Sequence, residues 1–254
     1  MKEMQGATFE LNATVSTNRQ AQRRMTMAQD VRIVKKLRTP RSAAIAGILF
    51  AVLLATSIVL IRLSIARDPA DAGAWLAQGG RRTAAVIGIN LIPFAGIAFL
   101  WFIGVIRDRM GEREDKFFAT VFLGSGLLFV AMLFAAAAVA IGMITMFKAA
   151  PARAAQSEVW TLGYHTTFAF LNLFAIKMAA VFMISSSTIA LRTSFINRWL
   201  AFLGLAIALV LLVASDIVPY VNLLMPFWVF LVSVDVLIKS RREGSESLVT
   251  TQGS

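Results

Sequence analysis

The stretch FFATVFLGSGLLFVAMLFAAAAVAIGMITMF, residues 117–147, decides the fold because it contains no charged side chain. A helix needs about 20 apolar residues to cross a hydrocarbon core of roughly 30 Å, at about 1.5 Å per residue. Residues 117–147 exceed that length, so they predict a membrane helix that tilts or extends past the bilayer. Backbone polar groups in lipid must be satisfied within the segment, which favours a helix.

Five other windows are apolar enough to be interpreted in the same way: 42–61, 84–106, 165–191, 199–215 and 221–238. Together the six windows predict an all-α membrane protein with six transmembrane helices in residues 42–238. A basic segment, residues 1–41, precedes this domain, and a disordered tail, residues 239–254, follows it. The composition agrees, because 15% of the 254 residues are charged, whereas a soluble domain has about 25%.

Lysine and arginine are divided unequally between the two sides of this predicted bundle. The side that holds the N-terminus has eighteen of them and the opposite side has six. Because cytoplasmic loops retain positive charge, both termini are predicted to lie in the cytoplasm. About forty mostly polar residues precede the first apolar window, so we expect a retained helix there rather than a cleaved signal peptide.

Basic residues gather just before the first apolar window. Such a cluster is attracted to anionic lipid headgroups by about 1 kcal/mol per charge. The net charge of +11 would also suit a nucleic-acid partner, but no helix-turn-helix pattern or zinc spacing accompanies it. We therefore predict contact with the anionic headgroups of the bilayer, and no nucleic acid, for Arg32, Lys35, Lys36, Arg38 and Arg41.

Lys177 lies in the middle of the fourth apolar window, where a charge is costly and suggests a function by default. Asp235 is its preferred partner, although the two differ in nominal depth. Asn172 is about 140° from Lys177 around a regular helix, so the two need not share a site. Asn90 is a further polar residue, in the second window. One interpretation is a polar path through which a small solute or ion is transported. The preferred one is a buried Lys177–Asp235 pair that fixes the helix arrangement.

Small residues recur at helical spacing and predict close helix packing, within the chain, with a second copy or with another membrane protein. In the first window they are Ala43, Gly47, Ala51 and Ala55; in the second, Gly88, Gly96 and Gly104; in the third, Gly124, Ala131, Ala135 and Ala138.

Motifs for catalysis are missing from the sequence. The chain has no Cys and one His, His165, and it lacks H-E-x-x-H, G-x-S-x-G and a P-loop. The prediction is a protein that is not an enzyme, with no catalytic residues, metal ligands or cofactor.

Two stretches, GEREDKFFATVFLGSGLLFVAMLFAAAAVA (111–140) and RWLAFLGLAIALVLL (198–212), resemble uncharacterised multi-pass membrane proteins of high-GC bacteria. The resemblance implies the bacterial cytoplasmic membrane and transfers no site residue. The sequence as a whole favours a structural, accessory or sensory membrane protein, with a small transporter or channel around Lys177 as the alternative.

Overall fold

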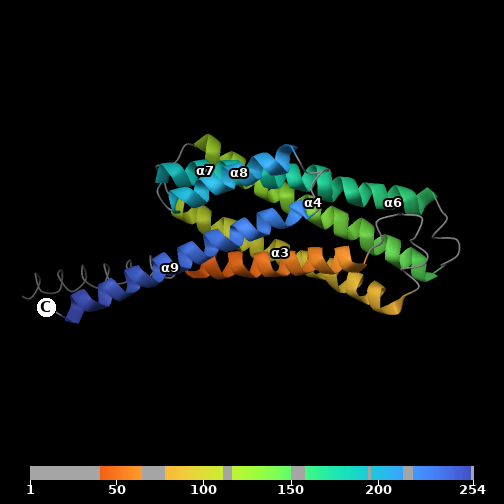
Figure 1. The fold of residues 1–254 in the computed structure, drawn as a ribbon, viewed down its shortest axis with the longest axis horizontal. Helices are drawn as coiled ribbons and strands as arrows, with labels where there is room; N and C mark the ends of the chain where they lie inside the picture. Colours follow the sequence, from red (N-terminus) through yellow and green to blue (C-terminus); the bar gives the residue numbers. More distant parts are fainter. Residues whose placement is uncertain are drawn as a thin grey trace, which may run out of the picture.

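The computed structural model describes residues 41–64, 78–110, 116–149, 158–193, 196–213 and 220–252. In these ranges the chain is all-helical, and the helices run alternately up and down one elongated bundle (Figure 1). Of the six helical rods formed there, five are long and apolar enough to cross a membrane. The helical membrane class that the sequence predicted is thereby supported.

The rods follow the predicted windows closely. The first helix, drawn in orange without a label, is Arg41–Ser64. Next come α3, Gly79–Met110, and α4, Lys116–Ala149. The fourth rod is a continuous run of α6 (Glu158–Phe168), the π-helix η2 (Ala169–Ala175) and α7 (Ile176–Thr193). The shorter α8 is Arg198–Val213, and a 3-10 turn, η3 (Val221–Leu223), leads into α9, Leu224–Gln252.

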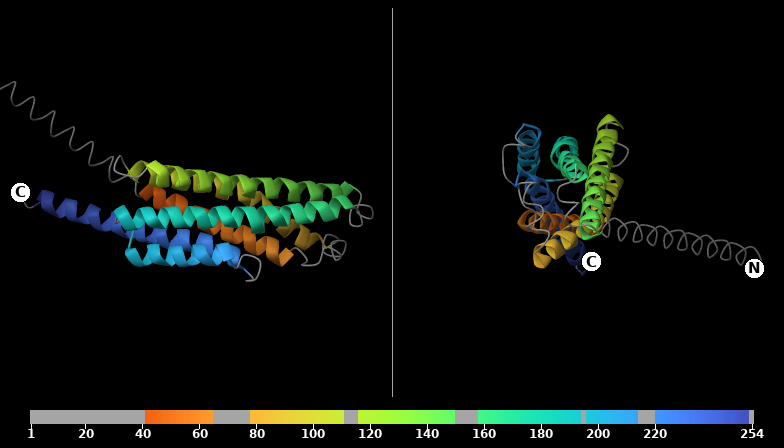
Figure 2. Two further views of the ribbon diagram at one scale, coloured as in Figure 1. Left: turned by 90° about the horizontal axis from the view of Figure 1, so that it is seen from above. Right: turned by 90° about the vertical axis from the view of Figure 1, so that its right-hand side faces the viewer.

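The bundle has two ends, named here the Arg41 end and the Ser64 end after the two ends of the first helix. Figures 1 and 2 show that α4 and α6 reach farther toward the Ser64 end than the junction between α8 and α9 does. In this projecting part α4 packs against α6. The excess length of residues 117–147 is therefore covered by a neighbouring helix.

The end of α9 differs from the prediction. The sequence predicted a disordered tail from residue 239, whereas α9 continues to Gln252. Extending an existing helix costs much less than nucleating a new one, and Lys239 pairs with Asp235 one turn earlier at 3.1 Å. The predicted basic segment lies outside the described residues except for Arg41.

Some of the predicted small-residue contacts are confirmed. Gly47 packs against Phe102 of α3 and Ser233 of α9, and Gly88 packs against the first helix at Ile61. The Oγ atom of the buried Ser57 donates a hydrogen bond of 2.7 Å to the carbonyl of Gly88. The first helix is therefore held closely between α3 and α9.

The predicted ridge on the third window does not make close contacts within the described chain, and packing against a second copy stays a prediction. Ala131 and Ala138 are exposed on α4, and no described atom lies within 4 Å of a Cβ built on Gly124. The close contact is made two residues later by Gly126, which faces Ile103. Spacing alone identified the helix but not the side of it that its neighbours cover.

Buried phenylalanines hold the centre of the bundle together. Phe99 of α3 lies 4.5 Å from Phe50 of the first helix and 5.0 Å from Phe182 of α7, between ring centroids. Phe122 and Phe129 of α4 join the same cluster. Offset and edge-on ring pairs at these distances add about 0.5–1.5 kcal/mol each beyond area burial.

Large apolar side chains also cover the outside of the bundle. Examples on four different helices are Leu49, Trp101, Phe202 and Phe227, each about half exposed or more. In water such a surface would be a large apolar patch, whereas in lipid it is the expected outer face. This surface and the five long apolar helices together support embedding in a membrane.

Candidate functional site: an apolar cavity with a polar cluster

A cavity of about 450 Å³ lies inside the bundle. It is partly open and is lined by the first helix, α3, α4, the α6–η2–α7 rod and the start of α9, with Leu211 of α8 at one side. Most of the lining is aliphatic or aromatic, as at Leu54, Ile58, Leu133 and Met143. Sites for small molecules typically have volumes of roughly 300–1,000 Å³ and such a mainly apolar lining.

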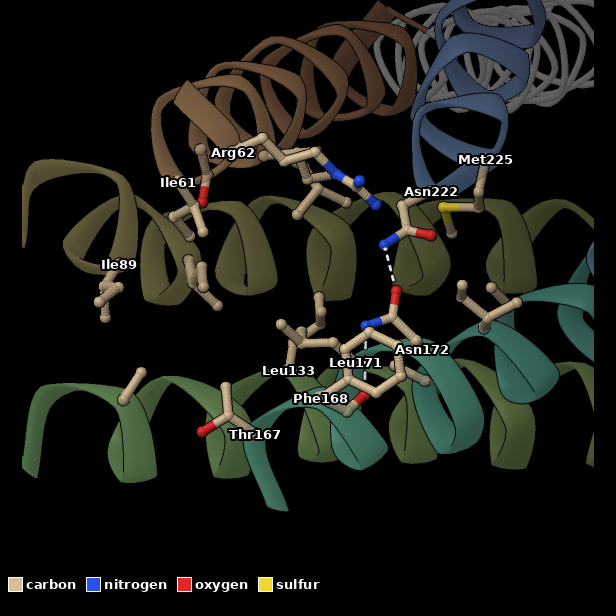
Figure 3. Close-up of a pocket in the computed structure, with 18 of the residues that line it drawn as sticks. Ile61, Arg62, Ile89, Leu133, Thr167, Phe168, Leu171, Asn172, Asn222 and Met225 are labelled. Atoms are coloured by element: carbon tan, nitrogen blue, oxygen red, sulfur yellow. Dashed lines mark hydrogen bonds between the residues drawn. The ribbon is translucent and has the colours of Figure 1, made fainter. Parts of the chain in front are cut away.

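A pair of amides forms the polar part of the lining (Figure 3). Asn222 Nδ2 donates to Asn172 Oδ1 at 3.0 Å, and Asn172 Nδ2 donates to the carbonyl of Phe168 at 3.2 Å. Two buried polar atoms, Asn222 Oδ1 and Thr167 Oγ1, have no hydrogen-bond partner among the described residues. Both atoms have almost no accessible surface, so they are buried behind the lining rather than facing the open space of the cavity.

Arg62 lies at the edge of the cavity. Its guanidinium carbon is 5.1 Å from the centroid of the Tyr220 ring, a distance typical of a cation–π contact. Figure 3 shows the guanidinium directed toward Asn222. Among the lining residues Arg62 is the only charged one, and no carboxylate of the described chain pairs with it. The edge of the cavity therefore carries a positive charge.

Asn172 belongs to η2, the π-helical segment of the fourth rod. In a π-helix the hydrogen bonds join residues five apart, and such segments are often found at functional sites. The predicted angle between Asn172 and Lys177 assumed a regular α-helix, so it does not apply. The segment AFLNLFA has the same apolar composition as the flanking helix, so its composition does not indicate a π-helix. Only Asn172, a polar residue at membrane depth, indicated a site here.

Lys177 and Asp235, the preferred pair of the sequence interpretation, have different partners in the structure. Lys177 is half-buried, and its Nζ donates to the backbone carbonyl of Leu212 near the C-terminal end of α8. The last carbonyls of a helix lack partners within the helix and carry partial negative charge. The ammonium of Lys177 therefore places a positive charge at the negative end of the α8 dipole.

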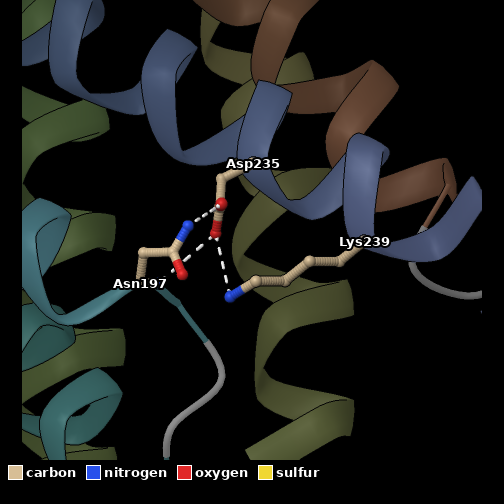
Figure 4. Close-up of polar contacts among 3 residues, drawn as sticks. All are labelled: Asn197, Asp235 and Lys239. Atoms are coloured by element: carbon tan, nitrogen blue, oxygen red, sulfur yellow. Dashed lines mark hydrogen bonds and ion pairs between the residues drawn. The ribbon is translucent and has the colours of Figure 1, made fainter. Parts of the chain in front are cut away.

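Asp235 lies near the Arg41 end, where it binds the start of α8 (Figure 4). Its carboxylate accepts hydrogen bonds from the side-chain Nδ2 of Asn197 at 2.5 Å and from the backbone N–H of Asn197 at 3.3 Å. Asn197 directly precedes α8, and its carbonyl accepts from Leu200 at 3.0 Å. Asp235 also pairs with Lys239 at 3.1 Å.

The four residues that the sequence grouped as one polar site are therefore not gathered in one place. Asn172 lines the cavity, whereas Asn90 is exposed and donates to Val86 of its own helix at 2.8 Å. Of the predicted headgroup contacts, Arg41 is exposed at the start of the first helix. Outside the described residues lie the other four, Arg32, Lys35, Lys36 and Arg38.

No group of three or more His, Cys, Asp or Glu side chains gathers in the described parts of the chain. No protein-family model, curated protein or solved structure matches this chain. The resemblance to membrane proteins of high-GC bacteria therefore stays a prediction from the sequence. The fold and the cavity together define a helical membrane protein with an internal, mainly apolar cavity.

Proposed function

We propose that this protein is a non-enzymatic membrane protein of accessory or sensory role that binds a small hydrophobic molecule in the cavity. The cavity itself is the observation that supports this role. Its lining supplies a mainly apolar surface with a few polar atoms, which is the usual pattern of a ligand site. Binding or releasing such a ligand changes how helices from separate parts of the chain are held together.

For the topology, we propose six crossings of a bacterial cytoplasmic membrane with both termini in the cytoplasm. Basic residues at the Arg41 end, including Arg41, Arg107, Arg192 and Arg198, support this orientation through the positive-inside rule. α8 has 16 residues, or about 24 Å. The bilayer can accommodate a short helix by local thinning at modest cost.

The transporter considered as the alternative has less support. A polar path would need Lys177, Asn172 and Asn90 to line one route, and Lys177, which donates to the backbone of α8, is not among the residues that line the cavity. Asn90 lies on an exposed helix face. Ligand binding needs neither residue, because the cavity and its amide pair are formed without them.

A photoactivatable hydrocarbon probe tests the proposal. The purified protein in neutral nanodiscs is labelled with a diazirine-bearing fatty alcohol, and the adducts are mapped by peptide mass spectrometry. Adducts are expected at cavity residues such as Leu133 and Met143. Ala140→Trp fills space along the lining and should remove them, whereas Ala131→Trp on the exposed face of the same helix should not. Adducts confined to exposed residues and unchanged by Ala140→Trp would overturn the proposal.

A further inference from the structure

We propose that the cavity takes a single-chain anionic amphiphile, with its acidic head at Arg62 and its hydrocarbon chain among the apolar lining residues. The inference rests on the proposed binding function and specifies the chemical class of the ligand. Three features of the described residues support it: the length of the cavity, the charge at its edge and the depth of that charge in the bundle.

The cavity is long for its volume. Its lining on α4 runs from Phe129 to Ile144, which is about 22 Å along the helix axis. On the first helix the lining runs from Arg62 to Leu54, about 12 Å. One leaflet of the hydrocarbon core is about 15 Å thick. An elongated apolar space of leaflet depth suits an extended hydrocarbon chain better than a compact molecule.

The charge of the ligand follows from Arg62. A guanidinium binds carboxylate and phosphate groups through two parallel hydrogen bonds. The described chain offers Arg62 the face of Tyr220 and no carboxylate, so its donors are available for an external anion. Figure 3 shows the guanidinium directed toward Asn222, whose Nδ2 donates to Asn172.

The depth of Arg62 agrees with this arrangement. Arg41 and Arg62 are separated by about 31 Å of helix, close to the roughly 30 Å thickness of the hydrocarbon core. With Arg41 at one interface, Arg62 reaches the opposite one, where Tyr220 is also typical of the headgroup level. An amphiphile entering from that leaflet would place its head at Arg62 and its chain toward Leu54.

The test uses a diazirine-bearing fatty acid on the full-length protein in phosphatidylcholine nanodiscs. Palmitate, lysophosphatidylglycerol and hexadecanol compete for labelling, so that a carboxylate, a phosphate and a neutral head are compared. The two anionic competitors should act at concentrations at least about tenfold lower than hexadecanol, given the usual strength of hydrogen bonds to charged groups. If palmitate competes at the lower concentration, the acidic head is a carboxylate. If lysophosphatidylglycerol does, the head is a phosphate.

Arg62→Gln should remove the advantage of the anionic competitors over hexadecanol, and Arg62→Lys should keep part of that advantage. Arg81→Gln, an exposed arginine at the same end of the bundle, should leave it unchanged. If palmitate and hexadecanol compete equally and Arg62→Gln alters neither, the anionic ligand is overturned while the binding function stands. If no amphiphile labels the cavity of the wild-type protein, both proposals fail.

Discussion

Lys177 and Asp235 bind opposite ends of the same helix, α8. Lys177 donates to the carbonyl of Leu212, one residue before α8 ends, and Asp235 accepts from Asn197, one residue before it begins. The cation is thus at the C-terminus and the anion at the N-terminus, which is the favourable arrangement for the helix dipole. α8 is the shortest of the described rods, and these contacts tie it to α7 and α9.

The first prediction concerns this arrangement. Lys177→Met should lower stability by about 1–2 kcal/mol, because a charged hydrogen bond to a helix end inside the membrane is lost. Adding Asp235→Leu should lower it further by an independent amount, since separated sites are usually additive. Thermal unfolding in detergent measures both effects. Recovery of stability in the double variant would instead indicate a direct pair.

The second prediction concerns the start of α8. Asp235→Ala should lower stability by about 1 kcal/mol, the usual effect of losing a helix cap, because its side chain is only 12% exposed and binds Asn197 twice. Lys239→Gln is the control. Its side chain is 36% exposed, so the ion pair itself should contribute about 0–1 kcal/mol. Equal losses from both variants would contradict the role of Asn197.

The third prediction compares two glycines. A Cβ on Gly47 would meet Ser233 and would lie 2.7 Å from Phe102 Cδ2, which is buried. Gly47→Ala should therefore lower stability by about 1–3 kcal/mol through overpacking. No described atom lies within 4 Å of a Cβ on Gly104, so Gly104→Ala should be neutral or stabilising by up to about 1 kcal/mol. Thermal unfolding of the two variants, measured side by side, distinguishes them.

The fourth prediction concerns topology and uses the absence of cysteine from the chain. Thr83→Cys, exposed at the Ser64 end, should react with a membrane-impermeant maleimide on intact cells. Ser42→Cys, exposed at the Arg41 end, should react only after lysis, because both termini are proposed to be cytoplasmic. The reverse pattern would show the opposite orientation.

Much of the helical architecture could be predicted from local sequence. The windows 84–106 and 117–147 lie inside α3 and α4, because a chain in lipid must satisfy its backbone hydrogen bonds within each segment. The polar partners could not be predicted in this way. Lys177 and Asp235 have the right charges for a pair, and nothing local shows that both are directed to α8.

The amino-acid sequence by itself determined the helical membrane class, the approximate positions of the apolar helices and the unequal division of basic residues, since each depends on residues near one another in the chain. Only the tertiary structure decided that Gly126 rather than Gly124 packs closely, that η2 is π-helical and that Asn172 meets Asn222. These features depend on how each helix is rotated about its axis and on which neighbour it faces. The cavity beside Arg62 also depends on the tertiary structure, because segments distant in the sequence line it together.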